Sequence, residues 1–272
     1  MPAEEAMVED RPRACKRFTQ NGHDFDVMGF EGDHIFETIR RTSDFYERVL
    51  LDALAAFLSP GDLVVDAGAN LGNHSLFFAG VCGAKVLAFE AFAPTASLLE
   101  RNVRESGLDD LVGIRALALG SGTGHVAPAA VDWTNVGSTR FEPVEAGVPV
   151  IALDDVGIDD RVALLKIDVE GMDVDVLQGA LAIIERDRPV ISCEASQAEE
   201  IRRLDQLAVE IGYSYLARYN ATATWVLLPA RTPIEQVVLE RHLITNTSMS
   251  HLGVRDLYYR VRLANEAIQL LQ

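Results

Sequence analysis

The stretch VVDAGANLGNHSLFF, residues 64–78, places a glycine-rich turn between two apolar runs. The first run has the length and composition of a buried strand, and the second has those of a helix. Gly68 and Gly72 allow a tight turn and a close approach of the backbone to a ligand, while the following helix N-terminus presents free N–H groups. The stretch therefore predicts a nucleotide-type binding loop at the end of a parallel strand.

The spacing and the acid in this loop distinguish between two cofactors. The dinucleotide pattern G-x-G-x-x-G has a longer last interval than Gly68-x-Asn70-x-Gly72. Asp66, at the predicted strand end, would repel a pyrophosphate but attract an ammonium or a sulfonium. The loop favours S-adenosylmethionine, and the alternative is an NAD- or flavin-dependent oxidoreductase.

The next predicted strand ends in a second acid. In KVLAFE, residues 85–90, Glu90 follows a run of apolar and small residues. An acid at this position accepts hydrogen bonds from both ribose hydroxyls of an adenosine, whichever cofactor carries it. We expect Glu90 to bind the ribose; the alternative is a glutamate at the surface.

A third motif, LLKIDVEGMDVDVLQGA, spans residues 164–180. The alternation of Lys166, Asp168 and Glu170 predicts that the three side chains share one face of a strand. Asp168 falls at the carboxyl end of this strand, where open α/β sheets bind ligands. Two further acids fall in the first turn of the next helix, where the helix dipole favours them, and we interpret them as structural: Asp173 and Asp175.

Strand and helix patterns alternate along most of the chain, which indicates βαβ units and a parallel sheet. The segment 119–149 is rich in Gly, Pro, Ser and Thr and predicts loops and a hairpin that contact substrate. Two strands joined by a turn near Asn220 are expected to close the sheet in antiparallel orientation. The predicted strands are 62–66, 85–89, 112–118, 162–168 and 189–194, and the predicted helices are 72–80, 94–106, 173–185 and 197–211.

The two ends of the chain have other patterns. Residues 1–20 are expected to be irregular, and helical spacing at 43–58 predicts a helix with Ser43 or Asp44 as N-cap. The tetrapeptide TPIE, 232–235, is a capping box. Apolar residues at 3,4 spacing between 254 and 271 predict a last helix, which packs on its own domain or forms a homodimer contact.

Composition argues against several kinds of partner. The chain has 272 residues and a net charge of −17, which argues against binding to nucleic acid or to an anionic membrane. Its three cysteines are far apart and form no metal-binding pattern, and their sparse, odd number fits a reducing, cytoplasmic location. The acidic N-terminus predicts no signal peptide, and no apolar run is long enough to span a membrane.

At these motifs the chain resembles the FkbM family of S-adenosylmethionine-dependent methyltransferases. The resemblance covers roughly residues 22–230; one departure is Ala91, where the family usually has Pro. It implies an α/β, Rossmann-like class I methyltransferase fold with a mostly parallel seven-stranded sheet and an antiparallel edge, with helical additions at both ends. We divide the chain into an N-terminal extension (1–60), a methyltransferase core (61–230) and a C-terminal helical extension (231–272). The resemblance is carried by VVDAGANLGNHSLFFA, VLAFEAFAPTASLLERNV, ALLKIDVEGMDVDVLQGA with RPVISCE, FYE at 45–47 and NVGS at 135–138.

The resemblance implies methyl transfer from S-adenosylmethionine to a hydroxyl, often on a sugar or a polyketide-type natural product, with S-adenosylhomocysteine as product. The acceptor would be a small molecule or a glycan. The alternatives are N-methylation of an amine and a non-catalytic binding module. The residues expected to bind the cofactor are Asp66, Gly68, Ala69, Asn70, Gly72, Asn73, Glu90, Ala91, Phe92 and Asp168, and those expected to bind the acceptor are Asn135, Glu194 and Tyr46.

A hydroxyl acceptor needs a general base to remove its proton as the new bond forms. Asp168 is the first candidate because of its place at the strand end, and His74 and Glu170 follow. His74 lies in the first turn after the loop, so it could instead bind the cofactor or a backbone carbonyl. Asp168, Glu170 and Glu194 could together supply oxygens to a divalent cation, but the sequence fixes no such site and we predict no metal.

Overall fold

A computed structural model describes residues 11–230 of the chain. The predicted capping box at 232–235 and the predicted last helix, with its possible dimer contact, lie outside the described residues. Within residues 11–230, no helix has both the length and the apolar character that crossing a membrane requires.

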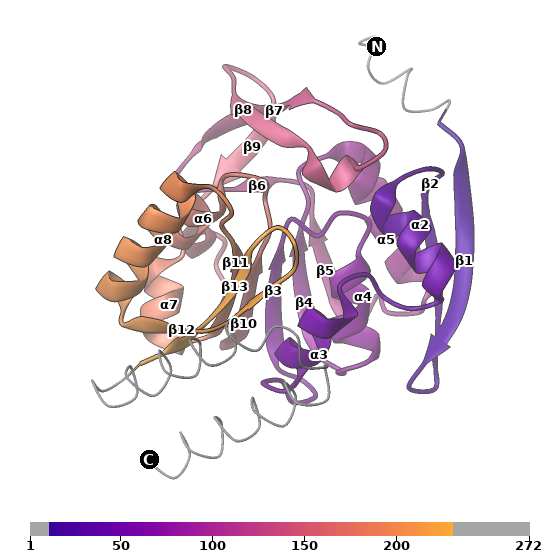
Figure 1. Ribbon diagram of the computed structural model, residues 1–272, viewed down its shortest axis with the longest axis horizontal. Helices are drawn as coiled ribbons and strands as arrows, with labels where there is room; N and C mark the ends of the chain where they lie inside the picture. Colours follow the sequence, from indigo (N-terminus) through magenta and orange to yellow (C-terminus); the bar gives the residue numbers. More distant parts are fainter. Residues whose placement is uncertain (1–10, 231–272) are drawn as a thin grey trace.

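A mixed seven-stranded sheet forms the centre of this α/β structure (Figure 1). Five neighbouring strands run parallel, and the hairpin predicted near Asn220 joins them in antiparallel orientation through β13. Asn220, with a φ of 62°, lies in the hairpin turn as predicted. In spatial order the strands are β12 (Tyr213–Tyr219), β13 (Thr224–Pro229), β11 (Val190–Glu194), β10 (Val162–Ile167), β3 (Leu63–Ala67), β4 (Lys85–Phe89) and β5 (Val112–Arg115).

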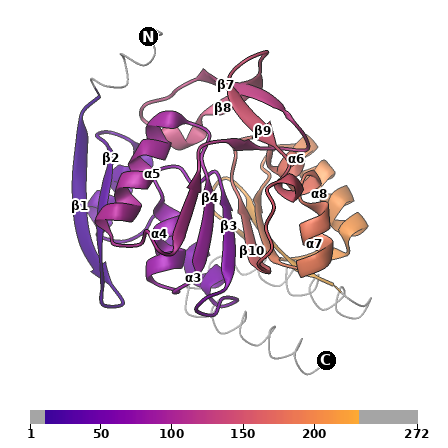
Figure 2. The ribbon, with the colours of Figure 1, turned by 180° about the vertical axis from the view of Figure 1, so that it is seen from behind.

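Helices cover both faces of this sheet (Figures 1 and 2). Alternate residues of a strand point to opposite faces, so Val64 belongs to one apolar core cluster and its neighbour Val65 to the other. The first cluster includes helices α3 (Arg48–Ala55), α4 (Asn73–Gly80) and α5 (Ala93–Glu105), and the second includes α6 (Asp173–Gln178), α7 (Leu181–Asp187) and α8 (Ala198–Ile211).

The helix predicted at 173–185 is two helices in the structure, with Gly179 between them. A Cβ atom on Gly179 would lie 2.0 Å from the carbonyl oxygen of Gly120. The backbone of another segment therefore reaches the chain at this position, and only glycine leaves room for it.

The N-terminal residues predicted to be irregular form a β-hairpin. Strands β1 (Arg13–Gln20) and β2 (His23–Phe30) pair in antiparallel orientation. The side chain of Asn102 on α5 holds this hairpin, since it accepts from Met28 N at 2.7 Å and donates to Met28 O at 2.9 Å. The sequence alone does not predict this hairpin, because the hydrogen bonds that hold it against α5 come from a residue 74 positions away.

The helix predicted at 43–58 begins later than expected. Helix α2 (His34–Thr42) ends at Ser43, which has a left-handed φ of 54°, so neither Ser43 nor Asp44 is the N-cap of α3. Glu47 precedes α3 in a left-handed conformation with a φ of 57°. This tight connection turns the side chain of Glu47 into the site described below.

The predicted loops and hairpin of 119–149 are a four-stranded sheet, which we call the cap (Figure 2). The cap begins and ends at neighbouring positions, because Gly120 N donates to Ile151 O at 3.0 Å. A short 3-10 helix, η1 (Val136–Ser138), interrupts it, and another, η2 (Leu153–Asp155), follows it. Its strands are β6 (Ala118–Leu119), β9 (Val148–Ile151), β7 (Gly124–Ala130) and β8 (Arg140–Pro143).

Candidate active site

A pocket of about 390 Å³ lies at the carboxyl ends of the central strands and beneath the cap. Its lining comes from the start of α2, the segment before α3, the glycine-rich loop, the ends of β4, β10 and β11, the turn between β12 and β13, and the cap. The structure brings nearly all predicted site residues to this pocket, and Asp66 and Gly72 are the exceptions. Those on the pocket are Gly68, Ala69, Asn70, Asn73, His74, Glu90, Ala91, Phe92, Asp168, Glu170, Asn135, Glu194 and Tyr46.

The two glycines of the loop have different roles. Gly68, with a φ of 77°, passes so close to β10 that a Cβ atom would lie 1.8 Å from the carbonyl oxygen of Asp168. Gly72, with a φ of 97°, faces α5, and its Cβ atom would lie 2.6 Å from Leu99 Cδ1. Gly68 therefore shapes the pocket, whereas Gly72 permits helix packing behind it.

Asp66 is buried beneath the loop and does not face the pocket. Its Oδ1 lies 2.9 Å from Lys166 Nζ, and its Oδ2 accepts a hydrogen bond from Ser75 Oγ at 2.6 Å. Burial opposes both charges, but their mutual attraction lowers the pKa of Asp66 and raises the pKa of Lys166. The structure does not support the expected attraction between Asp66 and a cationic cofactor, because Lys166 already neutralises this carboxylate and Asp66 does not line the pocket.

Lys166 lines the pocket, although the sequence assigned it no role there. Its Nζ donates to the carbonyl oxygen of Gly68 at 2.8 Å and lies 3.9 Å from Asp168 Oδ2. The signal was present in the alternation of residues 166, 168 and 170, which pointed this lysine toward the same strand-end region.

Glu90 is buried on the pocket and joins two loops. One carboxylate oxygen accepts from Asn70 N at 2.6 Å and the other from Phe92 N at 2.7 Å. Burial raises the pKa of Glu90 and these hydrogen bonds partly oppose that rise. Each oxygen keeps a second lone pair, so the carboxylate can still accept from ribose hydroxyls.

Asn73 holds Tyr46 in place. Its side-chain amide donates to Tyr46 O at 3.0 Å and accepts from Tyr46 N at 2.9 Å. Burial and the nearby charges of Glu47 and Asp168 raise the pKa of Tyr46 to about 12. The phenol therefore stays protonated and can donate to an acceptor, while the amide of Asn73 is engaged by backbone.

His74 forms a pair with a glutamate that the prediction did not name. His74 Nε2 lies 3.2 Å from Glu47 Oε2, and both side chains lie on the pocket largely buried. The glutamate was present in the quoted FYE motif, but its pairing depends on the left-handed turn before α3. The carboxylate of Glu47 therefore lies where it can orient the imidazole of His74 at the pocket.

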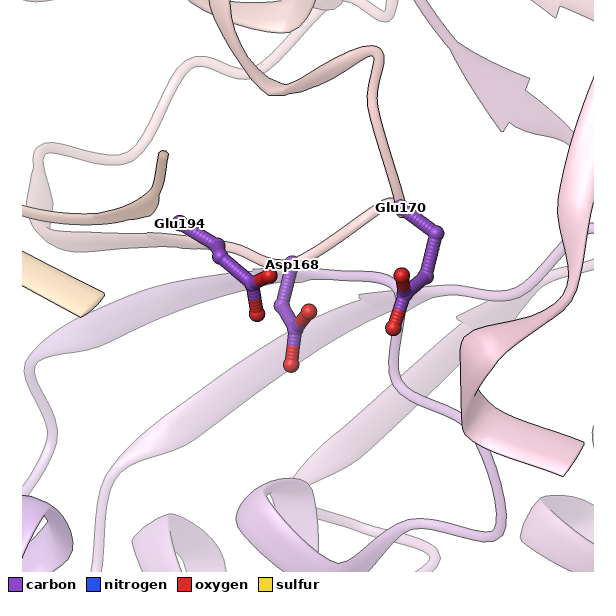
Figure 3. Close-up of side chains that lie close together, drawn as sticks. All are labelled: Asp168, Glu170 and Glu194. Atoms are coloured by element: carbon purple, nitrogen blue, oxygen red, sulfur yellow. The ribbon is translucent and has the colours of Figure 1, made fainter. Parts of the chain in front are cut away.

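Asp168, Glu170 and Glu194 gather at the ends of β10 and β11 (Figure 3). One carboxylate oxygen from each lies within 4.8 Å of the others. Burial, followed by the charge of Asp168, raises the pKa of Glu170 to about 7 and that of Glu194 to about 8. Glu170 and Glu194 can therefore exchange protons near neutral pH. The three carboxylates, which we call the acid cluster, can together attract a cation.

The two acids interpreted as structural make contacts within the protein. Asp173 accepts from the backbone N–H groups of Val169 and Gly171 at 3.3 and 3.2 Å. Asp175 pairs with Arg203 on α8 at 2.6 Å. Neither lines the pocket, as that interpretation requires.

The sequence profile of the methyltransferase FkbM domain matches residues 66–215, and the chain belongs to this family. This family is one of methyltransferases rather than of dinucleotide-dependent oxidoreductases. No curated protein matches the chain.

Solved structures give weaker similarities. A methyltransferase FkbM from Methylobacillus flagellatus KT is 19% identical with a TM-score of 0.49, over 63% of this chain and 44% of that one. This chain thus corresponds to less than half of that relative's length. An rRNA methylase from Streptococcus thermophilus is 14% identical with a TM-score of 0.45, over 67% and 95% of the two chains. A precorrin 8w decarboxylase from Methanobacterium thermoautotrophicum is 16% identical with a TM-score of 0.42, over 67% and 88%.

Proposed function

We propose that the protein transfers the methyl group of S-adenosylmethionine to a hydroxyl of a small molecule, on a Rossmann-like class I methyltransferase fold. The acceptor is a sugar or a polyketide-type compound, and S-adenosylhomocysteine is released. One observation carries the proposal beyond the family: the glycine-rich loop, Glu90 and the acid cluster all line a single pocket. A cofactor site and a group of proton acceptors therefore face the same space.

The pocket residues fit this cofactor. Glu90 offers free lone pairs to the ribose hydroxyls, and Phe92 and Leu119 offer apolar surface to the adenine. The carboxylates at the other strand ends suit the ammonium and sulfonium charges of the cofactor. The positive charge of Lys166 does not cancel them, because Asp66 already neutralises it. When bound, S-adenosylmethionine supplies an electrophilic methyl group and a good leaving group.

The protein's own residues then have two tasks. The first is alignment of the acceptor oxygen, which can contribute much of the rate increase. The second is removal of the hydroxyl proton, for which Asp168 is the base we propose. Glu170 can take the proton onward, because its pKa of about 7 lies near neutrality. His74, paired with Glu47, is the second candidate.

An amine acceptor is the second candidate function. Five acids line the pocket among the described residues, and the one lysine there is paired with Asp66. Such a pocket attracts an ammonium group, and an amine needs less help from a base than an alcohol does. The acids are Glu47, Glu90, Asp168, Glu170 and Glu194.

Two measurements test the proposal. Calorimetry should show that S-adenosylhomocysteine binds and that NAD does not. Intact-mass detection of methylated product, over matched panels of hydroxyl and amine acceptors, should then separate the two candidates. Binding of NAD in place of S-adenosylhomocysteine would overturn both, and methylation of amines alone would leave only the second.

A further inference from the structure

Two segments far apart in the sequence are among those that line the pocket outside the seven-stranded sheet. His34 and Ile35 come from the start of α2, and residues 135–139 come from the cap around η1. We call these residues the acceptor wall. They lie outside the glycine-rich loop and the strand ends, which hold the groups suited to the cofactor.

Asp33 joins the two halves of this wall. Its Oδ1 accepts from Phe36 N at 3.0 Å and caps α2, while its Oδ2 accepts from Val136 N at 2.9 Å. The side chain is buried, with a relative exposure of 2%. A backbone hydrogen bond of 2.8 Å from His34 N to Thr134 O runs beside it. One carboxylate thus satisfies two backbone donors that are 100 positions apart in the sequence.

The wall rests directly on the cofactor loop. A Cβ atom on Gly137 would lie 2.9 Å from Asn70 Nδ2 and 3.0 Å from Ile35 Cδ1. The turn at η1 therefore has little freedom to move inward, and the contact from Asp33 keeps it from moving outward. The position of this turn sets the shape of the pocket beside the acid cluster.

We propose that Asp33 is a positioning residue for acceptor selection. It holds the cap turn against α2 and so fixes the acceptor wall, while cofactor affinity depends on Gly68 and Glu90. The inference rests on the proposed methyl transfer, because the wall needs an acceptor to select. It predicts that loss of the hydrogen bond from Val136 N to Asp33 weakens acceptor recognition and leaves cofactor affinity unchanged.

The substitution Asp33→Ser tests this division. Serine is as good an N-cap as aspartate, so α2 keeps its cap, but one hydroxyl cannot also reach Val136 N. The matched control is Asp187→Ser, because Asp187 is also buried and accepts from the backbone N–H of Val162 at 2.9 Å, away from the pocket. A second variant, Val136→Pro, removes the same hydrogen bond from the donor side, and proline suits the first position of a helical turn.

Hydrogen exchange, calorimetry and kinetics are measured on the full chain. In Asp33→Ser the backbone N–H of Val136 should exchange with solvent at least about tenfold faster. KM for the hydroxyl or amine substrate that the wild type methylates should rise by about tenfold, which corresponds to the loss of one charge-assisted hydrogen bond. The Kd for S-adenosylhomocysteine should stay within about threefold, and Val136→Pro should show the same split between KM and Kd. Asp187→Ser should leave all three unchanged.

Results that contradict the role of Asp33 differ from results that contradict the proposed methyl transfer. Unchanged exchange at Val136 in Asp33→Ser, or a loss of S-adenosylhomocysteine affinity equal to the rise in KM, would overturn the role of Asp33. A wild-type protein that binds no S-adenosylhomocysteine would overturn the proposed function instead, and the exchange measurement would still decide whether Asp33 holds the wall.

Discussion

Asp66 and Lys166 form an ion pair buried beneath the glycine-rich loop, with 2.9 Å between Oδ1 and Nζ. Their side chains have relative exposures of 0% and 4%. The two residues face each other across β3 and β10, and Lys166 also donates to the carbonyl oxygen of Gly68 at 2.8 Å. The pair therefore links the floor of the pocket to the loop above it.

Breaking this pair should destabilise the protein strongly. Lys166→Met leaves the Asp66 carboxylate buried without a counter-charge and should lower the free energy of unfolding by about 3–5 kcal/mol. The double variant Asp66→Asn/Lys166→Met should recover part of the loss in urea unfolding. Lys85→Met is the control, because its pair with Asp160 is exposed and should contribute less than about 1 kcal/mol. Equal losses for Lys85→Met and Lys166→Met would contradict the argument.

Gly68→Ala should abolish binding of S-adenosylhomocysteine. The new Cβ would meet the carbonyl of Asp168 at 1.8 Å, and the φ of 77° is unfavourable for alanine. We expect a loss of at least about 2 kcal/mol in unfolding free energy with no detectable calorimetric binding. Gly122→Ala is the control, since nothing lies within 4 Å of its Cβ position. An alanine at 68 with normal affinity would place the cofactor elsewhere.

Glu90→Gln should weaken cofactor binding through the ribose. The amide keeps the shape of the side chain but loses the charge and one acceptor oxygen, so we expect a loss of about 1–3 kcal/mol in binding free energy. Calorimetry with a 2′,3′-dideoxy analogue of S-adenosylhomocysteine should show a much smaller loss. If the two ligands lose affinity equally, Glu90 acts only through its contacts with Asn70 N and Phe92 N.

Asp168→Asn should lower turnover by about 10²–10⁴-fold with little change in cofactor affinity, because the amide cannot accept the proton. Raising the pH should recover little of the rate. The control Asp175→Asn removes an acid that pairs with Arg203 outside the pocket and should retain its rate. If the acid cluster instead holds a divalent cation, a chelator will inactivate the wild type. A near-normal rate in Asp168→Asn without a chelator effect would leave His74 or Glu170 as the base.

Stability should fall with rising pH through the acid cluster. The pKa of Glu194 is raised to about 8, whereas an unfolded glutamate titrates near about 4.3, so the folded state binds more protons between these values. Its contribution is fully present below the unfolded pKa and is lost as the pH rises through about 8. Tm measured from pH 5 to pH 9 should decline less in Glu194→Gln than in the exposed control Glu210→Gln. Equal slopes would contradict this origin.

The features of the fold that depend on local sequence patterns could be predicted from the sequence. The strands around Asp66, Glu90 and Asp168 and the helices between them follow from alternating periodicity, and parallel strands bring their carboxyl ends to one edge. The pairings between distant segments could not be read in this way. The side chain of Asp66 faces Lys166 rather than the pocket, and the His74 pair depends on the left-handed turn at Glu47. Both are tertiary contacts without a sequence period.

The cap has a consequence for how acceptor preference can change during evolution. It leaves and re-enters the main fold at adjoining points, where Gly120 N meets Ile151 O, so it is an excursion of the chain between β5 and β10. Another excursion could replace it without altering any strand pairing of the seven-stranded sheet. Asp33 binds a backbone N–H of the cap, so this contact requires only a turn of the same shape from a replacement, whereas the side chains of Val136 and Trp133 also pack on the first core cluster. A change within this excursion can thus reshape the lining that it gives to the pocket while the sheet that carries the other lining residues keeps its pairing.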